Sequence, residues 1–159
     1  MDFDWSPEEV AFREEVREFI RREMTDEVKG SIFIDTPARV EFVTKMARLG
    51  WLGMGFPEKY GGSPNPFPLA QFILNAELDR SGAPIIGKNV GTIASTIFHV
   101  ASEDMKMEFL PRIFRNEGQW AITYTEPNAG TDLGSMQCRA IDKGAGGAGM
   151  EGKKQQGYF

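Results

Sequence analysis

The sequence predicts a mainly α-helical protein in which a helical bundle is followed by the first strands of an incomplete β domain. Apolar residues recur at helical spacing in separate segments of the first 118 residues, and most segments begin or end at a capping signal. Beyond that point β-prone and alternating stretches take over. We therefore expect a helical domain over residues 1–118 and a partial β domain over residues 119–159.

Composition argues against several classes of function. The net charge of −5, with scattered lysines and arginines, argues against a nucleic-acid-binding protein, which needs a clustered basic surface. One histidine and one cysteine provide no metal-binding cluster, and the unpaired cysteine fits a reducing cytoplasm. The N-terminus is acidic where a secretory signal is basic, and no apolar segment is long enough to cross a bilayer. We expect a cytoplasmic protein without a membrane span, a metal or a nucleic-acid partner.

The first two helices have clear boundaries. Ser6 is placed as an N-cap, Pro7 occupies the first helical position, and Glu9 can complete a capping box. The stripe expected to face the core consists of Phe12, Val16, Phe19, Ile20 and Met24. A second helix is expected to begin after Thr36 and to end at Gly50. Its inward residues are predicted to be Val40, Val43, Met46, Ala47 and Leu49.

The next segment, residues 50–62, contains too many glycines for a regular element. We interpret it as a packed loop anchored by Trp51, Phe56 and Tyr60. A third helix follows and ends near Ser81. Its inward residues are predicted to be Leu69, Phe72, Ile73, Ala76 and Leu78.

A fourth helix is predicted over residues 89–100. It is apolar on most sides, which places it at the centre of the bundle. His99, near its end, is interpreted as a capping or buried polar residue rather than a catalyst. Ser102 is expected to cap a further short helix that ends before Pro111.

Strand-like patterns appear toward the C-terminus. A β-prone run at residues 120–125 meets a Glu-Pro break, and alternation of apolar and polar residues predicts a strand over residues 133–141. Residues 144–149 match Gly-x-Gly-x-x-Gly, but no amphipathic helix follows to direct its N-terminus at a pyrophosphate. We therefore predict a flexible hairpin connection at residues 143–149.

The stretch over residues 120–132 has the composition of a ligand-binding loop. Thr123, Thr125 and Thr131 offer hydroxyls that donate and accept hydrogen bonds, and Gly130 has no Cβ to keep a ligand away. Such groups orient a cofactor but do not abstract protons. From the residues alone, an ordinary strand followed by a polar turn is the simpler interpretation.

Two segments resemble those of a known family. Residues 125–132, Thr-Glu-Pro-Asn-Ala-Gly-Thr-Asp, resemble the signature of acyl-CoA dehydrogenases, flavoenzymes that desaturate acyl-CoA thioesters between the α and β carbons. Residues 50–62 are similar to the Gly-Trp-Leu-Gly and Pro-Glu-x-Tyr-Gly-Gly segment near the start of that family. The resemblance implies the family's N-terminal helical bundle, joined to the start of its middle β domain.

The resemblance also implies roles for individual residues. Ile122, Tyr124 and Thr125 would lie beside the isoalloxazine ring of FAD, with Thr125 hydrogen-bonded to it. Gly130 and Thr131 would reach the FAD pyrophosphate and the acyl-CoA substrate, so Thr131 is also a substrate-binding candidate.

In this family the catalytic base is a carboxylate in a later C-terminal domain. No residue of this chain is therefore nominated as catalytic, and Glu126 is expected to be structural. We expect the N-terminal part of an FAD-dependent acyl-CoA dehydrogenase that is catalytically incomplete by itself. Family members bury flavin at subunit contacts, which implies a homo- or hetero-oligomer for the full fold. Two alternatives stay open: a non-catalytic helical interaction module, and a non-functional truncated remnant.

Overall fold

The computed structural model describes residues 4–29, 36–84, 86–87, 89–118, 120–122, 125–142 and 148–151. The chain divides into two compact units, Met1–Trp120 and Ala121–Phe159, which are described separately below. The first is helical, and the second contains a short β-hairpin. The predicted mainly α fold class is confirmed.

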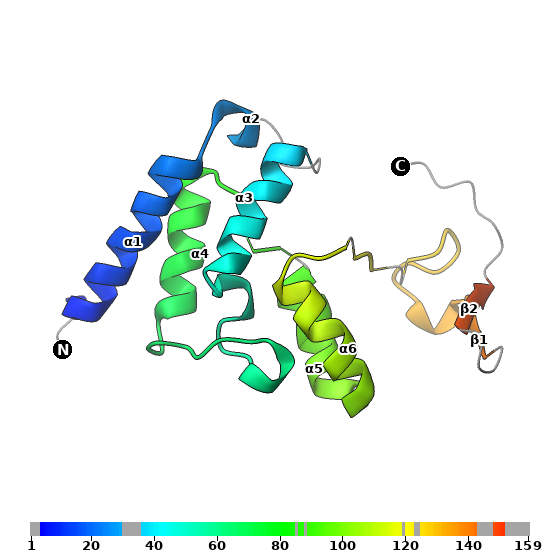
Figure 1. The fold of residues 1–159 in the computed structure, drawn as a ribbon. Helices are drawn as coiled ribbons and strands as arrows, with labels where there is room; N and C mark the ends of the chain where they lie inside the picture. The colour runs from blue at the N-terminus through cyan, green and yellow to red at the C-terminus, as the bar shows by residue number, and fades with distance from the viewer. Residues whose placement is uncertain are drawn as a thin grey trace. The chain divides into compact units, whose positions relative to one another are not determined.

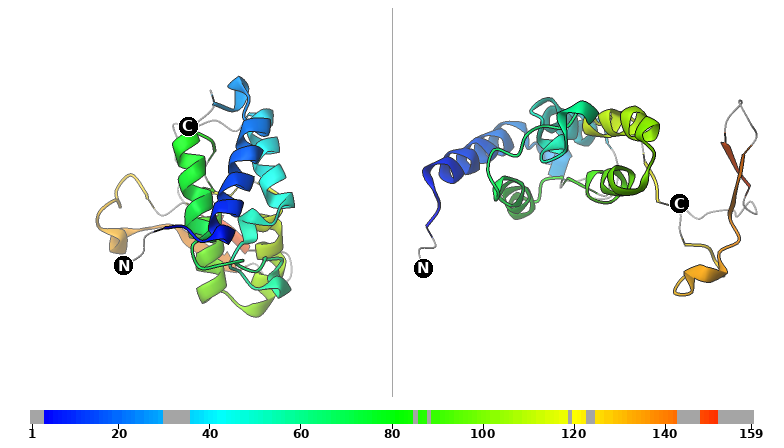
Figure 2. Two further views of the ribbon diagram at one scale, coloured as in Figure 1. Left: turned by 90° about the vertical axis from the view of Figure 1, so that its left-hand side faces the viewer. Right: turned by 90° about the horizontal axis from the view of Figure 1, so that it is seen from below.

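The helices of the first unit are α1 Pro7–Glu23, α2 Asp26–Lys29, α3 Pro37–Arg48, α4 Ala70–Ser81, α5 Ser95–Val100 and α6 Glu103–Phe114. Shorter helical segments occupy Trp51–Gly53, Glu58–Tyr60 and Asn89–Ala94. Helix α1 packs along α4 with α3 beside them, and α5 pairs with α6 (Figure 1, Figure 2).

Three helices begin at the predicted N-caps. The side-chain oxygens of Ser6, Thr36 and Ser102 each accept a hydrogen bond from the backbone N–H three residues further on. At the first of them the capping box is complete, because the Ser6 N–H donates to the Glu9 carboxylate at 2.7 Å. The buried stripe of α1 is the predicted one: Phe12, Val16, Phe19 and Ile20, with Met24 partly buried at the C-cap.

Trp51 packs against α1 in the helical core. Its ring centroid lies 5.1 Å from that of Phe19, in an edge-on arrangement. The predicted anchors Trp51 and Tyr60 are buried, and Phe56 is partly buried. Their loop is folded tightly, since a Cβ added to Gly62 would lie 2.2 Å from the Phe56 carbonyl oxygen. Two short 3₁₀ helices interrupt this loop, where the glycine content predicts no regular element.

The buried face of α3 differs from the predicted one. Phe42 and Met46 are buried, and the Phe42 ring lies 5.2 Å from that of Phe19. Val40 and Leu49, which were expected to face inward, are exposed. At 3.6 residues per turn, Val40 lies about 200° around the helix from Phe42, so both cannot face α1.

The buried face of α4 also differs from the prediction. Leu69 precedes the helix and Phe72 lies on its outer side, where it is 61% exposed. The buried residues are Ala70, Ile73, Leu74, Glu77 and Leu78. These buried residues follow regular helical spacing, but one of them is a glutamate. From the hydrophobic pattern alone, a glutamate is predicted to lie on the solvent-exposed face.

The predicted fourth helix is divided into two segments, and its expected central position is wrong. A π-helical segment over Asn89–Ala94 continues directly into α5. Val90 and Ala94 of the π segment are buried, but no residue of α5 is. His99 is exposed rather than buried, and its Nδ1 lies 2.7 Å from the Ser95 carbonyl oxygen.

Helix α6 continues through Pro111 instead of ending before it. The proline costs about 3 kcal/mol in a helix interior. Continuation buries Ile113 and Phe114, each worth about 1.5–3 kcal/mol when removed from water, which offsets that cost. Burial of these two side chains therefore outweighs the helix-breaking effect of Pro111.

In the second unit, strands β1 Arg139–Asp142 and β2 Ala148–Glu151 pair antiparallel. The predicted hairpin connection over residues 143–149 stays a prediction, because residues 143–147 lie outside the described residues. Residues 148 and 149 belong to β2. The strand expected from residue 133 is wrong in its first part, because Leu133–Ser135 forms a 3₁₀ helix capped by Asp132. The expected strand before the Glu-Pro break is absent at the described residues 120–122.

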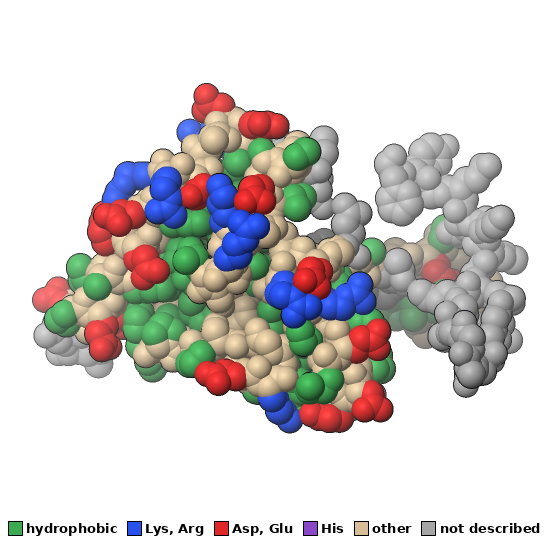
Figure 3. Space-filling view, viewed as in Figure 1, with side chains coloured by type: hydrophobic (Ala, Val, Ile, Leu, Met, Phe, Trp, Pro, Cys, Tyr) green, Lys and Arg blue, Asp and Glu red, His purple; other side chains and the backbone are tan. Residues whose placement is uncertain are grey.

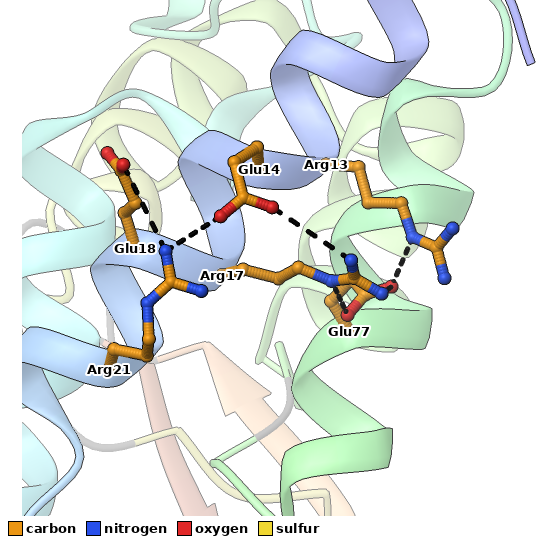
Figure 4. Close-up of polar contacts among 6 residues, drawn as sticks. All are labelled: Arg13, Glu14, Arg17, Glu18, Arg21 and Glu77. Atoms are coloured by element: carbon orange, nitrogen blue, oxygen red, sulfur yellow. Dashed lines mark hydrogen bonds and ion pairs between the residues drawn. The ribbon is translucent and has the colours of Figure 1, made fainter.

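The contact between α1 and α4 contains a buried carboxylate, that of Glu77 (Figure 4). Its Oε1 accepts from Arg13 Nε at 2.6 Å, and its Oε2 accepts from Arg17 Nε at 2.9 Å. Burial alone would raise the pKa of Glu77, but the hydrogen bonds from Arg17 and Arg13 outweigh it and hold the pKa below its ordinary value. The carboxylate therefore stays ionised inside the interface.

We expect Glu77→Gln to lower the free energy of unfolding by about 3 kcal/mol, because two arginines lose their shared carboxylate. The loss should be largest at neutral pH. Since the pKa of Glu77 is lowered, its stabilisation is complete above the ordinary glutamate value and disappears as pH falls through the folded-state pKa. Urea unfolding of both proteins, followed by circular dichroism between about pH 7 and pH 3, measures both effects.

The matched control for this prediction is Glu14→Gln. Glu14 belongs to the same polar network, where it pairs with Arg21 at 2.7 Å, but its side chain is 51% exposed (Figure 4). This variant should cost less than about 1 kcal/mol. Equal losses in the two variants would contradict a special role for the buried carboxylate.

Candidate functional site

The candidate ligand loop, residues 125–138, is closed at its start by a tight turn. Glu126 and Ala129 exchange backbone hydrogen bonds, each of 3.0 Å, with Pro127 and Asn128 at the two central positions. Ala129 is buried within this turn. The predicted turn is therefore formed by the signature residues themselves.

The Glu126 side chain spans the loop from one end to the other. Its Oε2 accepts a hydrogen bond from the backbone N–H of Gln137 at 2.9 Å. Its Oε1 accepts from the backbone N–H of Cys138 at 2.7 Å. Both oxygens of the carboxylate thus stabilise the folded conformation of the loop.

Asp132 and Ser135 are also engaged within the loop. Asp132 Oδ1 accepts from the backbone N–H of Gly134 at 3.2 Å and caps the 3₁₀ helix. The Ser135 hydroxyl donates to the Asp132 carbonyl oxygen at 2.8 Å. The sequence analysis missed this capping role, which an Asx-turn pattern of Asp-x-Gly could have indicated.

The hydroxyls of two loop threonines have no hydrogen-bond partner among the described residues. Thr125 and Thr131 are exposed, and no described residue hydrogen-bonds either hydroxyl. Gly130 is exposed as well, and a Cβ built on it would meet nothing within 4 Å. Its φ lies outside the left-handed region, so neither packing nor backbone conformation within the described residues requires glycine there.

The structure thus brings three of the predicted site residues, Thr125, Gly130 and Thr131, onto one internally braced loop. Ile122 precedes the loop and is 36% exposed, so part of its apolar side chain could contact a ligand. Tyr124 lies outside the described residues.

The described part of the helical unit includes two open hollows. One, of about 500 Å³, is lined by Phe72, Asn75, Ala76, Asp79 and Ile86. The other, of about 350 Å³, is lined by Glu8, Ala11, Phe12, Glu15, Pro66 and Phe67. Neither is lined by a residue of the ligand loop, and both are open depressions without a convergent set of polar groups.

Charge is distributed rather than clustered in the helical unit. On the face in Figure 3, acidic and basic side chains of described residues are interspersed with apolar ones. The described residues contain no group of three or more acidic, histidine or cysteine side chains placed to hold a metal ion. Within the described part of the chain, no helix combines the length and the apolar character needed to span a bilayer.

Among known proteins, the chain is similar to acyl-CoA dehydrogenases. It is 32% identical over 151 residues to acyl-CoA dehydrogenase FadE26 of Mycobacterium tuberculosis, covering 91% of this chain and 37% of that protein. It is 31% identical over 147 residues to the short-chain-specific acyl-CoA dehydrogenase of Clostridium acetobutylicum, covering 91% of this chain and 38% of that protein. The chain thus spans less than two fifths of the length of these relatives.

Solved structures show the same similarity. The ChsE4–ChsE5 complex from Mycobacterium tuberculosis matches with a TM-score of 0.74 and 31% identity, over 91% of this chain and 37% of that one. An acyl-CoA dehydrogenase from Bacillus anthracis, solved in complex with FAD, matches with a TM-score of 0.68 and 25% identity, over 86% of this chain and 24% of that one. The family model of the acyl-CoA dehydrogenase N-terminal domain matches residues 6–117. The chain therefore belongs to the acyl-CoA dehydrogenase family, through its N-terminal domain.

Proposed function

We propose that this chain is the N-terminal part of an FAD-dependent acyl-CoA dehydrogenase, with a helical domain over residues 1–118 and part of the β domain over residues 119–159. The observation that carries the proposal is the division of roles within the ligand loop. Its carboxylates and Ser135 are engaged in folding the loop, whereas two threonine hydroxyls and a bare glycine backbone have no partner among the described residues. Open neutral donors and acceptors on a braced loop are suited to orienting a cofactor.

Each open residue has a role in this proposal. FAD would supply the acceptor for the β-hydride of an acyl-CoA thioester. Thr125 would hydrogen-bond the isoalloxazine ring, with Ile122 and Tyr124 packed along it. Gly130 would allow the FAD pyrophosphate to approach the backbone, and Thr131 would bind FAD or the acyl-CoA chain.

Removal of the α-proton requires a general base, and we assign none in this chain. In the family that this chain resembles, the base is a carboxylate of a later C-terminal domain. Within the loop, backbone N–H groups fix both oxygens of Glu126, and Asp132 caps a 3₁₀ helix, so both carboxylates have structural roles. The proposal therefore locates the base in another segment or subunit of the complete enzyme.

The proposal extends to partners and location. A structural relative of this chain is a complex of two proteins, ChsE4 and ChsE5. We propose a homo- or hetero-oligomeric enzyme in the cytoplasm, which accords with an unpaired cysteine.

A non-catalytic interaction module is the second candidate, and one observation favours it. Phe72, 61% exposed, and Leu69, 45% exposed, lie at the start of α4, and Phe72 lines the larger hollow. Exposed apolar surface of this kind marks protein contacts. It is equally consistent with packing against the remainder of a complete dehydrogenase, so a ligand test separates the two.

The test is the visible absorption spectrum of the purified chain after incubation with FAD and desalting. A retained flavin band supports the proposed function. A folded chain that retains no flavin, and does not quench flavin fluorescence in titration, would favour the interaction module.

We expect Thr125→Val to weaken FAD binding about fivefold, because one neutral hydrogen bond, worth about 1 kcal/mol, is lost without a change of shape. Flavin fluorescence titration measures the Kd. Thr96→Val, at a threonine of α5 that is also exposed, serves as the control and should bind FAD like the wild type. An unchanged Kd in Thr125→Val would remove Thr125 from the flavin site.

We expect Gly130→Ala to leave the fold intact, because its Cβ would enter open space. FAD binding should nevertheless weaken at least about tenfold, since the methyl group occupies the position that the ligand approaches. Gly91→Ala, whose Cβ also meets nothing within 4 Å, is the matched control in the helical unit. Equal FAD affinity in the two variants would show that no ligand contacts Gly130.

A further inference from the structure

We infer that the Glu126 carboxylate is a latch that pre-forms the ligand loop, residues 125–138, before any ligand is bound. This inference rests on the proposed function for the identity of the ligand, FAD, but not for the latch itself. Glu126 is then a positioning residue, which acts through the backbone of the loop and does not contact the cofactor.

The geometry of the two hydrogen bonds carries this inference. They join Glu126 to Gln137 and Cys138, which follow it by 11 and 12 residues and come directly before β1. Among the side-chain hydrogen bonds of the described part of this loop, these two span the most residues. The side chain thus closes the loop on itself and ties it to the hairpin.

The observed closure uses both oxygens of the carboxylate. Two consecutive backbone N–H groups donate to the side chain, one to each oxygen, so an isosteric amide in the same position loses one of the two bonds. Glutamine offers one acceptor and places an NH₂ donor against the other N–H. Charge-assisted bonds of this kind are also roughly twice as strong as neutral ones.

The latch brackets the residues that the proposal assigns to the ligand. Thr125 directly precedes Glu126, and Gly130 and Thr131 lie between the two ends that it joins. Without the latch these residues would sample many arrangements, and FAD binding would have to order them. Closure in the free chain removes that cost from the binding step.

The experiment compares wild type with Glu126→Gln, which has the same shape. Amide hydrogen exchange of the full chain without FAD reports on Gln137 and Cys138 directly. We expect both amides to exchange at least about tenfold faster in the variant, and FAD to bind at least about tenfold more weakly. Saturating FAD should restore their protection in the variant, which loss of fold would not allow.

Glu108→Gln is the matched control, because Glu108 is exposed on α6, outside the ligand loop. It should change neither the exchange of the two amides nor the FAD affinity. Unchanged amide exchange in Glu126→Gln would overturn the latch. Faster exchange with unchanged FAD affinity would overturn its role in positioning. If the wild type binds no FAD, the proposed function and the positioning role fall together, while the exchange comparison still decides whether Glu126 closes the loop.

Discussion

The helical unit depends on one constraint, that a carboxylate removed from water must find partners. Glu77 satisfies it with Arg13 and Arg17, at 2.6 and 2.9 Å. These two arginines are one turn apart on α1, so the carboxylate fixes both the register and the rotation of α1 against α4. That rotation turns the Phe12 and Phe19 face of α1 toward Trp51, and the aromatic core follows from it.

A buried polar group also finds its partner in the glycine-rich loop. Tyr60, buried in the glycine-rich segment, donates its hydroxyl hydrogen to Glu103 at 2.8 Å and so holds that segment against the start of α6. Lys59 also pairs with Glu103, and the hydrogen bonds from Lys59 and Tyr60 hold the pKa of Glu103 below its ordinary value. In the described residues, no buried side-chain nitrogen or oxygen atom lacks a hydrogen-bond partner. Carboxylates thus define loop geometry in both units.

Local signals in the sequence predict where the helices begin, but they do not always predict which face of a helix is buried. The capping box at Ser6 could be predicted because all its atoms lie within four residues. The buried face of α4 could not, because Glu77 is tolerated there through arginines 60 or more residues away. The candidate site shows the same difference between local signals, which the sequence reveals, and contacts with distant residues, which it does not. Motif resemblance nominated Thr125 and Gly130 as candidates, whereas the engagement of Glu126 depends on two distant backbone amides that no residue type reveals.

Gly130 is a glycine that neither its backbone conformation nor its described neighbours require. Glycine costs about 0.5–1 kcal/mol more conformational entropy on folding than alanine would. A positive φ or a close neighbour normally justifies that cost, as for Gly62 against the Phe56 carbonyl, but Gly130 has neither. Within the described residues nothing in the chain compensates for it. Gly91 of the helical unit shares both properties, so an unconstrained glycine does not by itself indicate a ligand. What distinguishes Gly130 is its position between Thr125 and Thr131, whose exposed hydroxyls have no hydrogen-bond partner among the described residues and are suited to the proposed polar cofactor.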